Sequence, residues 1–364
     1  MRRRHQLVAA ALSRHSAKVR AYLRFKKIAY DEIAASNRIY RTLIPPHSPI
    51  PLFISDEGVV VEDATGIIEF VELRYPSAAI FPKGPVQRLI ALLMNAYAED
   101  CLVLAAMQQR FAIDENRAFV VAELGQLAFP HAPPAARQEV GEALARRLAE
   151  PLEALGVGPE TAPAIEASYL AWLTELDLHL TFQPYLLGTR PSFGDFALFG
   201  PLYAHLYRDP ASGRLMKSHA PRVAAFVERM ETPPRPLSGN FLDDDMVAPG
   251  IDPLLARVFG ELGPLIEQAA ELLRRRARDA PSGPVPRRLG RARLTLGGAG
   301  LEREVEALTL LRFQRAHAHY QVLTGTAREQ ADELLARTGG RELLAQPMPR
   351  LRREGRRLFC TESS

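Results

Sequence analysis

The sequence predicts an α+β chain in which a small domain of strands and helices precedes a larger, all-helical part. Short apolar runs alternate with helical patterns over residues 1–83. After Pro85 the chain contains long stretches with apolar residues at every third or fourth position, and Pro- and Gly-rich clusters separate these stretches. A length of 364 residues suits two or three domains.

The first 83 residues predict the order strand, helix, strand, irregular stretch, hairpin and helix. Each strand is a short apolar run, and each helix has apolar residues three and four positions apart. Strands are expected at residues 6–12, 28–33, 50–54 and 59–61, and helices at 17–25 and 63–73. Asp56-Glu57-Gly58 provides the turn of the hairpin.

The remainder of the chain is expected to be helical. The expected helices lie at residues 86–111, 135–155, 160–180, 193–207 and 255–276, followed by 305–323 and 327–337 after a Pro/Gly-rich break at 281–286. Ser192 and Asp195, three residues apart and ahead of an apolar run, predict reciprocal caps at a helix start.

The segment after residue 280 is expected to be ordered. An apolar stripe on its first helix, formed by Leu308, Leu311, Phe313 and Tyr320, needs a surface to cover it. We therefore expect this segment to dock on the helical domain rather than to extend as a free basic arm.

Composition limits the classes of function. Apolar residues make up 47% and charged residues 24% of the chain, which is typical of a globular protein in water. The longest apolar run near the start, Leu7 to Leu12, is far shorter than the roughly 20 residues that cross a membrane. The two cysteines, Cys101 and Cys360, exclude a disulfide framework, a zinc ribbon and a Cys-based redox pair. We expect a cytoplasmic protein that uses no metal and no membrane.

The net charge of +4 is distributed unevenly. Residues 281–364 hold 15 Arg and 9 acidic residues, so they carry +6 and residues 1–280 carry −2. The first 41 residues hold 11 Lys and Arg against Asp31 and Glu32, a pattern also found in organelle transit peptides. A removable peptide is not expected, because residues 6–33 form the first elements of the fold. Nucleic-acid binding is not expected either, because the basic segments lack interleaved aromatic residues and zinc-ligand spacing.

Four segments, taken in order, resemble the glutathione S-transferase family. Residues 13–20 are similar to its serine-type active-site loop, and Ile50-Pro51 matches its Val-Pro with a cis proline. Residues 61–70 resemble its acid-Ser motif and the helix that follows, and residues 185–196 resemble the capping box of its helical domain. The resemblance covers about residues 5–275. It implies a thioredoxin-like βαβ-ββα domain at 1–83, an all-helical domain at 84–250 and a helical C-terminal extension at 251–364.

Ser13 is the candidate catalytic residue. The resemblance implies that its hydroxyl donates a hydrogen bond to the thiolate of glutathione, the co-substrate. Such a charge-assisted bond is worth roughly 1.5–3 kcal/mol, and about 1.4 kcal/mol corresponds to one pKa unit. A thiol with a pKa of about 8.5 would then ionise near or below neutral pH. Ser13 and Ser16 also fit a purely structural role as caps of the following helix.

Ile50, Pro51 and Asp63 are the candidate glutathione-binding residues. The resemblance implies that a cis Ile50–Pro51 bond turns the Ile50 backbone toward the cysteinyl unit, and that Asp63 meets the γ-glutamyl amine. Asp63 fits an N-cap of the next helix equally well. Ala64 stands where the family has Ser, which removes roughly 1.5–3 kcal/mol of hydrogen bonding to a charged carboxylate. Weak or altered glutathione binding is therefore an open alternative.

Other residues have two interpretations each. Arg38, Arg41 and His47 fit either a site for the glycine carboxylate of glutathione or a solvated loop. Tyr97, Cys101 and Met107 fit either an acceptor pocket or the helical core, and Cys101 is expected to be buried and inert.

The polar residues beside these candidates have structural interpretations. His15 fits either a base or a solvated loop histidine, and Arg14 fits either a contact to an anionic ligand or an exposed charge; in both cases the exposed, solvated role is expected. His317 and His319 lie two apart on a helix, where they cannot share a face, so a paired metal site is not expected.

The function implied by the resemblance is the transfer of glutathione to a small electrophile, or a related glutathione-dependent step, as in detoxification. Family members of this shape usually form homodimers, so a homodimer is expected. The alternative is a non-catalytic binding or interaction protein that kept the fold and lost the glutathione site. Ala64 favours this alternative, whereas Ser13, Pro51 and Asp63 favour the enzyme.

Overall fold

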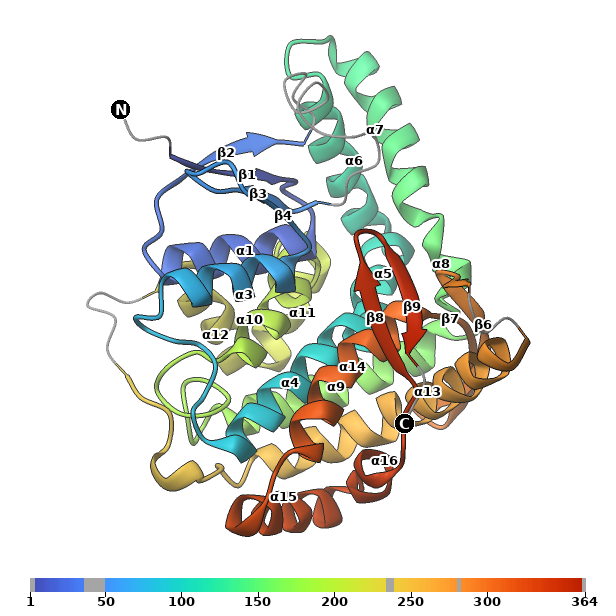
Figure 1. The fold of residues 1–364 in the computed structure, drawn as a ribbon. Helices are drawn as coiled ribbons and strands as arrows, with labels where there is room; N and C mark the ends of the chain where they lie inside the picture. The colour runs from blue at the N-terminus through green and yellow to red at the C-terminus, as the bar shows by residue number, and fades with distance from the viewer. Residues whose placement is uncertain (1–3, 36–49, 234–238, 280–282, 362–364) are drawn as a thin grey trace.

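The structure is a computed structural model that describes residues 4–35, 50–233, 239–279 and 283–361. A small sheet with two helices lies beside a bundle of long helices, and the C-terminal segment packs across that bundle (Figure 1).

The N-terminal sheet has four strands in the order β2-β1-β3-β4. The strands are β1 (His5–Ala9), β2 (Tyr30–Ala34), β3 (Leu52–Ile54) and β4 (Val60–Glu62). β1 and β2 are parallel, whereas β3 is antiparallel to both β1 and β4. The helices α1 (Arg14–Phe25) and α3 (Ala64–Arg74) cover one face of the sheet (Figure 1). This arrangement is a thioredoxin-like fold, as the sequence predicted.

The second part of the chain is a helical bundle. Its helices are α4 (Pro85–Asp100), α5 (Leu102–Ala112), α6 (Asp114–Ala128), α7 (Pro134–Ala149), α8 (Pro151–Ala154), α9 (Ala162–His179), α10 (Phe193–Pro201), the π-helix η1 (Leu202–Tyr207), α11 (Pro210–His219) and α12 (Pro221–Glu231). By length and composition the stretch Pro85–Ala112 could cross a membrane, and its apolar part is wholly buried within the protein.

Two expected helices of the bundle are divided. The stretch expected at 86–111 is interrupted at Cys101, where α4 ends and α5 begins. The stretch expected at 193–207 changes from α-helix to π-helix after Pro201, a residue that has no N–H to continue the α-helical hydrogen bonds.

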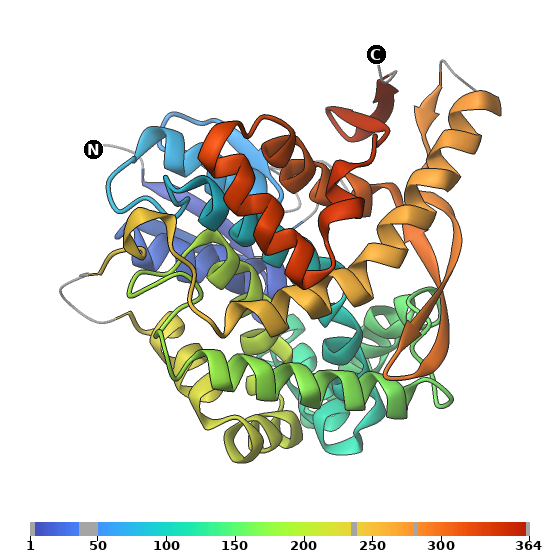
Figure 2. The ribbon, with the colours of Figure 1, turned by 90° about the horizontal axis from the view of Figure 1, so that it is seen from below.

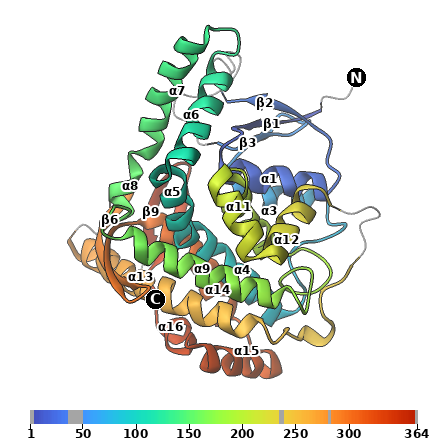
Figure 3. The same cartoon turned by 180° about the vertical axis from the view of Figure 1, so that it is seen from behind.

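Helices α6 and α7 run side by side and project beyond the rest of the bundle (Figure 3). They approach so closely at Gly125 and Gly141 that a Cβ at either position would collide with the backbone of the opposite helix, so only glycine fits there. Sequence reasoning missed α6, whose apolar and polar residues do not separate onto two faces.

The C-terminal extension contains strands as well as the expected helices. Its helices are α13 (Ile251–Asp279), α14 (Ala307–Gln321), α15 (Gly325–Thr338) and α16 (Arg341–Ala345), and its strands are β5 (Pro284–Val285), β6 (Arg288–Leu296), β7 (Ala299–Glu306), β8 (Arg350–Glu354) and β9 (Arg357–Thr361). Strands β6 and β7 form one antiparallel pair, and β5, β9 and β8 form a second small sheet.

The extension docks on the bundle, as the apolar stripe predicted. Helix α14 packs against α4 and α13, and Figure 2 shows the extension lying across the helices. Phe313 and Tyr320 are fully buried, whereas Leu308 and Leu311 are only partly buried. The partly buried end of the stripe faces the cavity described below.

Candidate functional site

The strand register gathers the sequence-predicted residues at one edge of the N-terminal sheet. Leu52 pairs with Val8 on one side and with Glu62 on the other. The segment after β1, the residues before β3 and the residue after β4 therefore lie at the same edge. These positions contain Ser13, Ile50-Pro51 and Asp63, respectively.

Ser13 begins helix α1 as its N-cap. Its Oγ accepts a hydrogen bond of 3.2 Å from the Ser16 N–H, and Ser16 Oγ in turn accepts one of 3.2 Å from the Ala10 N–H. The capping interpretation of Ser13 therefore holds. The cap uses the hydroxyl oxygen as an acceptor, so the Ser13 proton can still be donated to a ligand.

The Ile50–Pro51 peptide bond is cis, and Pro51 is buried at the start of β3. Asp63 is the N-cap of α3, where its Oδ1 accepts a hydrogen bond of 3.0 Å from the Thr65 N–H. Its other oxygen, Oδ2, lies 3.2 Å from Arg353 Nη1 in strand β8. Ala64, the next residue, is nearly fully buried.

Two cavities adjoin this edge of the sheet. The larger, of about 450 Å³, lies between α3, α4 and the C-terminal extension, and Pro51, Asp63 and Ala64 are part of its lining. The smaller, of about 390 Å³, includes Ser13 in its lining. Its apolar lining residues are Leu12, Met107, Phe111, Leu124, Leu127 and Leu148. His15 and Ile50 line both cavities, so the two cavities meet at these residues.

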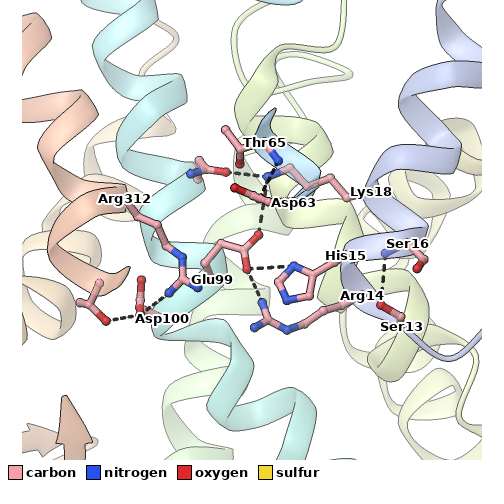
Figure 4. A network of polar contacts seen from close by, with 12 residues as sticks. Ser13, Arg14, His15, Ser16, Lys18, Asp63, Thr65, Glu99, Asp100 and Arg312 are labelled. Atoms are coloured by element: carbon pink, nitrogen blue, oxygen red, sulfur yellow. Dashed lines mark hydrogen bonds and ion pairs between the residues drawn. The ribbon is translucent and has the colours of Figure 1, made fainter. Parts of the chain in front are cut away.

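A buried carboxylate lies beside this junction (Figure 4). Three basic side chains from the first turns of α1 contact Glu99 in α4. The distances to a Glu99 carboxylate oxygen are 2.5 Å from Arg14 Nη1, 3.4 Å from His15 Nδ1 and 3.6 Å from Lys18 Nζ. Lys18, only 1% exposed, also donates a hydrogen bond of 2.7 Å to Asn95 Oδ1. The expectation that Arg14 is a solvated charge was wrong, because its side chain is largely buried against Glu99.

Burial and neighbouring charges shift the pKa values of these groups in different directions. Burial alone would raise the pKa of Glu99, but His15, Arg14 and Lys18 hold that pKa well below its ordinary value of 4.5. The pKa of His15 is lowered from 6.5, mainly by burial and then by the Arg14 charge, so its imidazole is neutral at neutral pH. The pKa of Lys18 is lowered by burial, which Glu99 partly offsets.

A second buried acid joins the extension to the same helix. Asp100 Oδ1 accepts a hydrogen bond of 2.7 Å from Thr309 Oγ1 and lies 3.0 Å from Arg312 Nη1 (Figure 4). Arg312 also lines the larger cavity. Sequence reasoning missed Glu99 and Asp100, although two adjacent acids in an otherwise apolar helix are a signal for buried, paired charges.

The other predicted residues are distributed between core and cavity. Met107 lines the smaller cavity. Tyr97 donates a hydrogen bond of 2.9 Å to Glu261 and is buried, as is Cys101, whose thiol pKa is raised mainly by burial. Arg38, Arg41 and His47 lie outside the described residues.

The two histidines of the C-terminal extension, His317 and His319, contact different backbone carbonyl groups. His317 Nε2 lies 2.9 Å from the Gln346 carbonyl oxygen, and His319 Nε2 lies 2.8 Å from that of Pro85. In the part of the chain that the structure describes, no three His, Cys, Asp or Glu side chains form a group that could hold a metal ion.

The helical domain contains the predicted reciprocal cap. Asp195 Oδ2 accepts hydrogen bonds of 2.7 Å from the Ser192 N–H and 2.6 Å from its hydroxyl, and Oδ1 accepts one of 2.9 Å from the Leu186 N–H. Burial raises the pKa of Asp195 to about 6, against the opposing effect of these hydrogen bonds. The cap joins the loop after α9 to the start of α10.

The segment around this cap is similar to a known domain family. Residues 160–234 match the family of the glutathione S-transferase C-terminal domain. The match runs from just before α9 to just beyond α12. It supports the glutathione S-transferase family, in agreement with the thioredoxin-like domain that precedes the bundle.

Solved structures of glutathione S-transferases are among those similar to this chain. One from Rhodospirillum rubrum is 17% identical, with a TM-score of 0.38, and the match covers 67% of this chain and 96% of that one. A rice enzyme in complex with glutathione is 16% identical, with a TM-score of 0.39 and coverage of 63% and 88%. A beta-etherase from Sphingobium is 18% identical, with a TM-score of 0.45 and coverage of 63% and 96%. No curated protein matches the chain by sequence.

Proposed function

We propose that this protein is a glutathione transferase of the serine type that joins glutathione to a small, apolar electrophile. The observation that carries the proposal is the junction of the two cavities at His15 and Ile50. A peptide held by the Ile50 backbone with its γ-glutamyl end at Asp63 would place its thiol at that junction. The thiol would then face Ser13 and the apolar cavity.

The two cavities suit the two reactants. The larger cavity contains charged groups that can bind the termini of a peptide, whereas the lining of the smaller one includes six leucine, methionine and phenylalanine side chains. Both arginines that line the smaller cavity are paired: Arg110 with Asp209 through hydrogen bonds of 2.7 and 2.8 Å, and Arg14 with Glu99. Because these charges are already paired, the smaller cavity favours an apolar electrophile.

In the proposed reaction Ser13 donates its proton in a hydrogen bond to the glutathione thiolate, after the thiol proton has passed to solvent. In a substitution, the sulfur forms a bond to the electrophilic carbon and the leaving group departs with its electron pair. In an addition, the electrons move onto the acceptor, which then takes up a proton from solvent. Ser13 stays neutral throughout, because its role is to stabilise the thiolate. A homodimer and a cytoplasmic location stay predictions.

The competing function is a non-catalytic binding or interaction protein that has lost the glutathione site, and Ala64, which lacks the hydroxyl of the family motif, favours it. Calorimetric titration of the full chain with glutathione, together with an assay for thioether formation with an apolar aryl halide, separates the two functions. The transferase predicts saturable binding and product above the uncatalysed rate. No glutathione binding would support the competing function, and saturable binding without product would contradict the transferase.

A further inference from the structure

The C-terminal extension forms one wall of the larger cavity. Helix α14 contributes Leu308, Leu311, Arg312 and Arg315, and strand β8 contributes Arg353. The opposite wall is formed by Pro51 and by the start of α3 at Asp63–Thr65. Residues more than 240 positions apart in the sequence therefore enclose one space.

Contacts to neighbouring elements hold this wall in place. Gln314 in α14 makes two hydrogen bonds to the backbone of Leu351, of 2.7 Å to its N–H and 3.1 Å to its carbonyl, so α14 fixes strand β8. Arg315 is bound to both carboxylate oxygens of Glu69 in α3. The cavity of about 450 Å³ remains with these contacts made, so the extension is a wall of the site and does not fill it.

Most charges that line the cavity are already paired. Glu99 is neutralised by Arg14 and Lys18, which approach it from α1. Arg312 is paired with Asp100, and Arg315 is paired with Glu69. The charged pair that lines the cavity from both walls is Arg353 and Asp63.

Arg353 and Asp63 together suit the two charges of an amino-acid head group. Their contact is one hydrogen bond of 3.2 Å from Arg353 Nη1 to Asp63 Oδ2. A guanidinium has five N–H donors and a carboxylate about four acceptor positions, so the pair can bind a ligand without separating. Asp63 would accept from an ammonium group, and Arg353 would donate to the adjacent carboxylate.

We propose that Arg353 binds the α-carboxylate of the ligand's γ-glutamyl group, next to Ala64, so that the extension completes the glutathione site. The inference rests on the proposed function. Arg353 would supply the carboxylate contact that the missing hydroxyl at position 64 cannot make.

The test compares glutathione with its γ-aminobutanoyl analogue, which keeps the ammonium and thiol groups but lacks the α-carboxylate. Calorimetric titrations use the full chain and the variants Arg353→Ala, Arg353→Lys and Arg356→Ala. Arg356 is the matched control, because it lies on the same hairpin and forms a similar pair with Glu62, at 2.6 Å, but is not part of the described cavity lining.

We expect Arg353→Ala to weaken glutathione binding by about 10- to 100-fold and to leave binding of the analogue unchanged. Arg353→Lys should restore part of the loss, and Arg356→Ala should bind glutathione as the natural chain does. Equal binding of glutathione and the analogue by the natural chain would overturn the inference. So would an equal loss in the two alanine variants, or tighter glutathione binding by Arg353→Ala, which would make the hairpin a competitor of the ligand.

The two proposals fail in different ways. If the natural chain binds no glutathione, the proposed function fails and the inference fails with it. If the natural chain binds glutathione but Arg353→Ala binds it equally well, only the role of the extension is overturned.

Discussion

Arg14 Nη1 lies 2.5 Å from Glu99 Oε2, and this ion pair joins the first turn of α1 to the last turn of α4. His15 and Lys18 approach the same carboxylate from α1. The contact therefore holds the thioredoxin-like domain on the helical bundle at the point where the two cavities meet.

Replacing Glu99 should destabilise the protein strongly. Glu99→Gln leaves Arg14 and the buried Lys18 without their counter-charge, and breaking a buried pair in this way costs about 3–5 kcal/mol of unfolding free energy. Denaturant unfolding of the full chain measures the loss. Glu115→Gln is the control, because it removes an exposed pair with Arg214 and should leave stability unchanged. Equal effects of the two substitutions would contradict the account of the Glu99 cluster.

The same cluster predicts an acid dependence. The pKa of Glu99 in the folded protein lies well below its ordinary value of 4.5, so the stability that it contributes is complete above that value. It is lost as the pH falls through the folded pKa. The stability difference between the natural chain and Glu99→Gln should therefore shrink below about pH 4.5, as measured by unfolding at a series of pH values. A difference that stays constant at low pH would contradict this.

Restoring the family hydroxyl should tighten glutathione binding. Ala64 lines the larger cavity beside Asp63, so a serine there can donate to a ligand carboxylate. Ala64→Ser should improve binding by up to about 1.5–3 kcal/mol, measured by calorimetric titration. Ala318→Ser introduces a hydroxyl on the opposite, α14 wall and should leave binding unchanged. An unchanged dissociation constant for Ala64→Ser would mean that the γ-glutamyl end binds elsewhere.

The extension should contribute to the stability of the whole chain. Phe313 in α14 is fully buried, and Phe313→Ala should lower the unfolding free energy by about 3–5 kcal/mol. Val322→Ala, one residue beyond the end of the same helix and 72% exposed, should have little effect. If Phe313→Ala unfolds like the natural chain, the extension is not docked in solution and a basic interaction arm becomes the better account.

Local patterns predicted the order of strands and helices in the first part of the chain, and the family resemblance implied their thioredoxin-like arrangement. Short apolar runs marked the strands, whereas the pairing of Leu52 with Val8 and Glu62 is known from the structure alone. The Ser192–Asp195 cap was equally predictable, because both partners lie within one helical turn. Such features depend on residues close together in the sequence.

The long-range half of the site could not be predicted in this way. The sequence indicated an apolar stripe after residue 280, but nothing local specified that Arg353 would lie beside Asp63 or that Arg312 would line the same cavity. The strands β6–β9 were also missed, because the Arg residues of β6 and the Glu residues of β7 look like solvated charged segments. In the structure these charges pair across the hairpin, for example Arg288 with Glu304.

The central claim is that the Ser13 hydroxyl stabilises a glutathione thiolate, and a spectroscopic titration of the bound thiolate tests it most directly. Ser13→Ala should raise the pH at which bound glutathione ionises by about one to two units, because it removes one charge-assisted hydrogen bond. Ser16→Ala, whose side chain bonds to the Ala10 backbone, should leave that pH unchanged. The same ionisation in Ser13→Ala as in the natural chain would contradict the claim and leave Ser13 with its capping role alone.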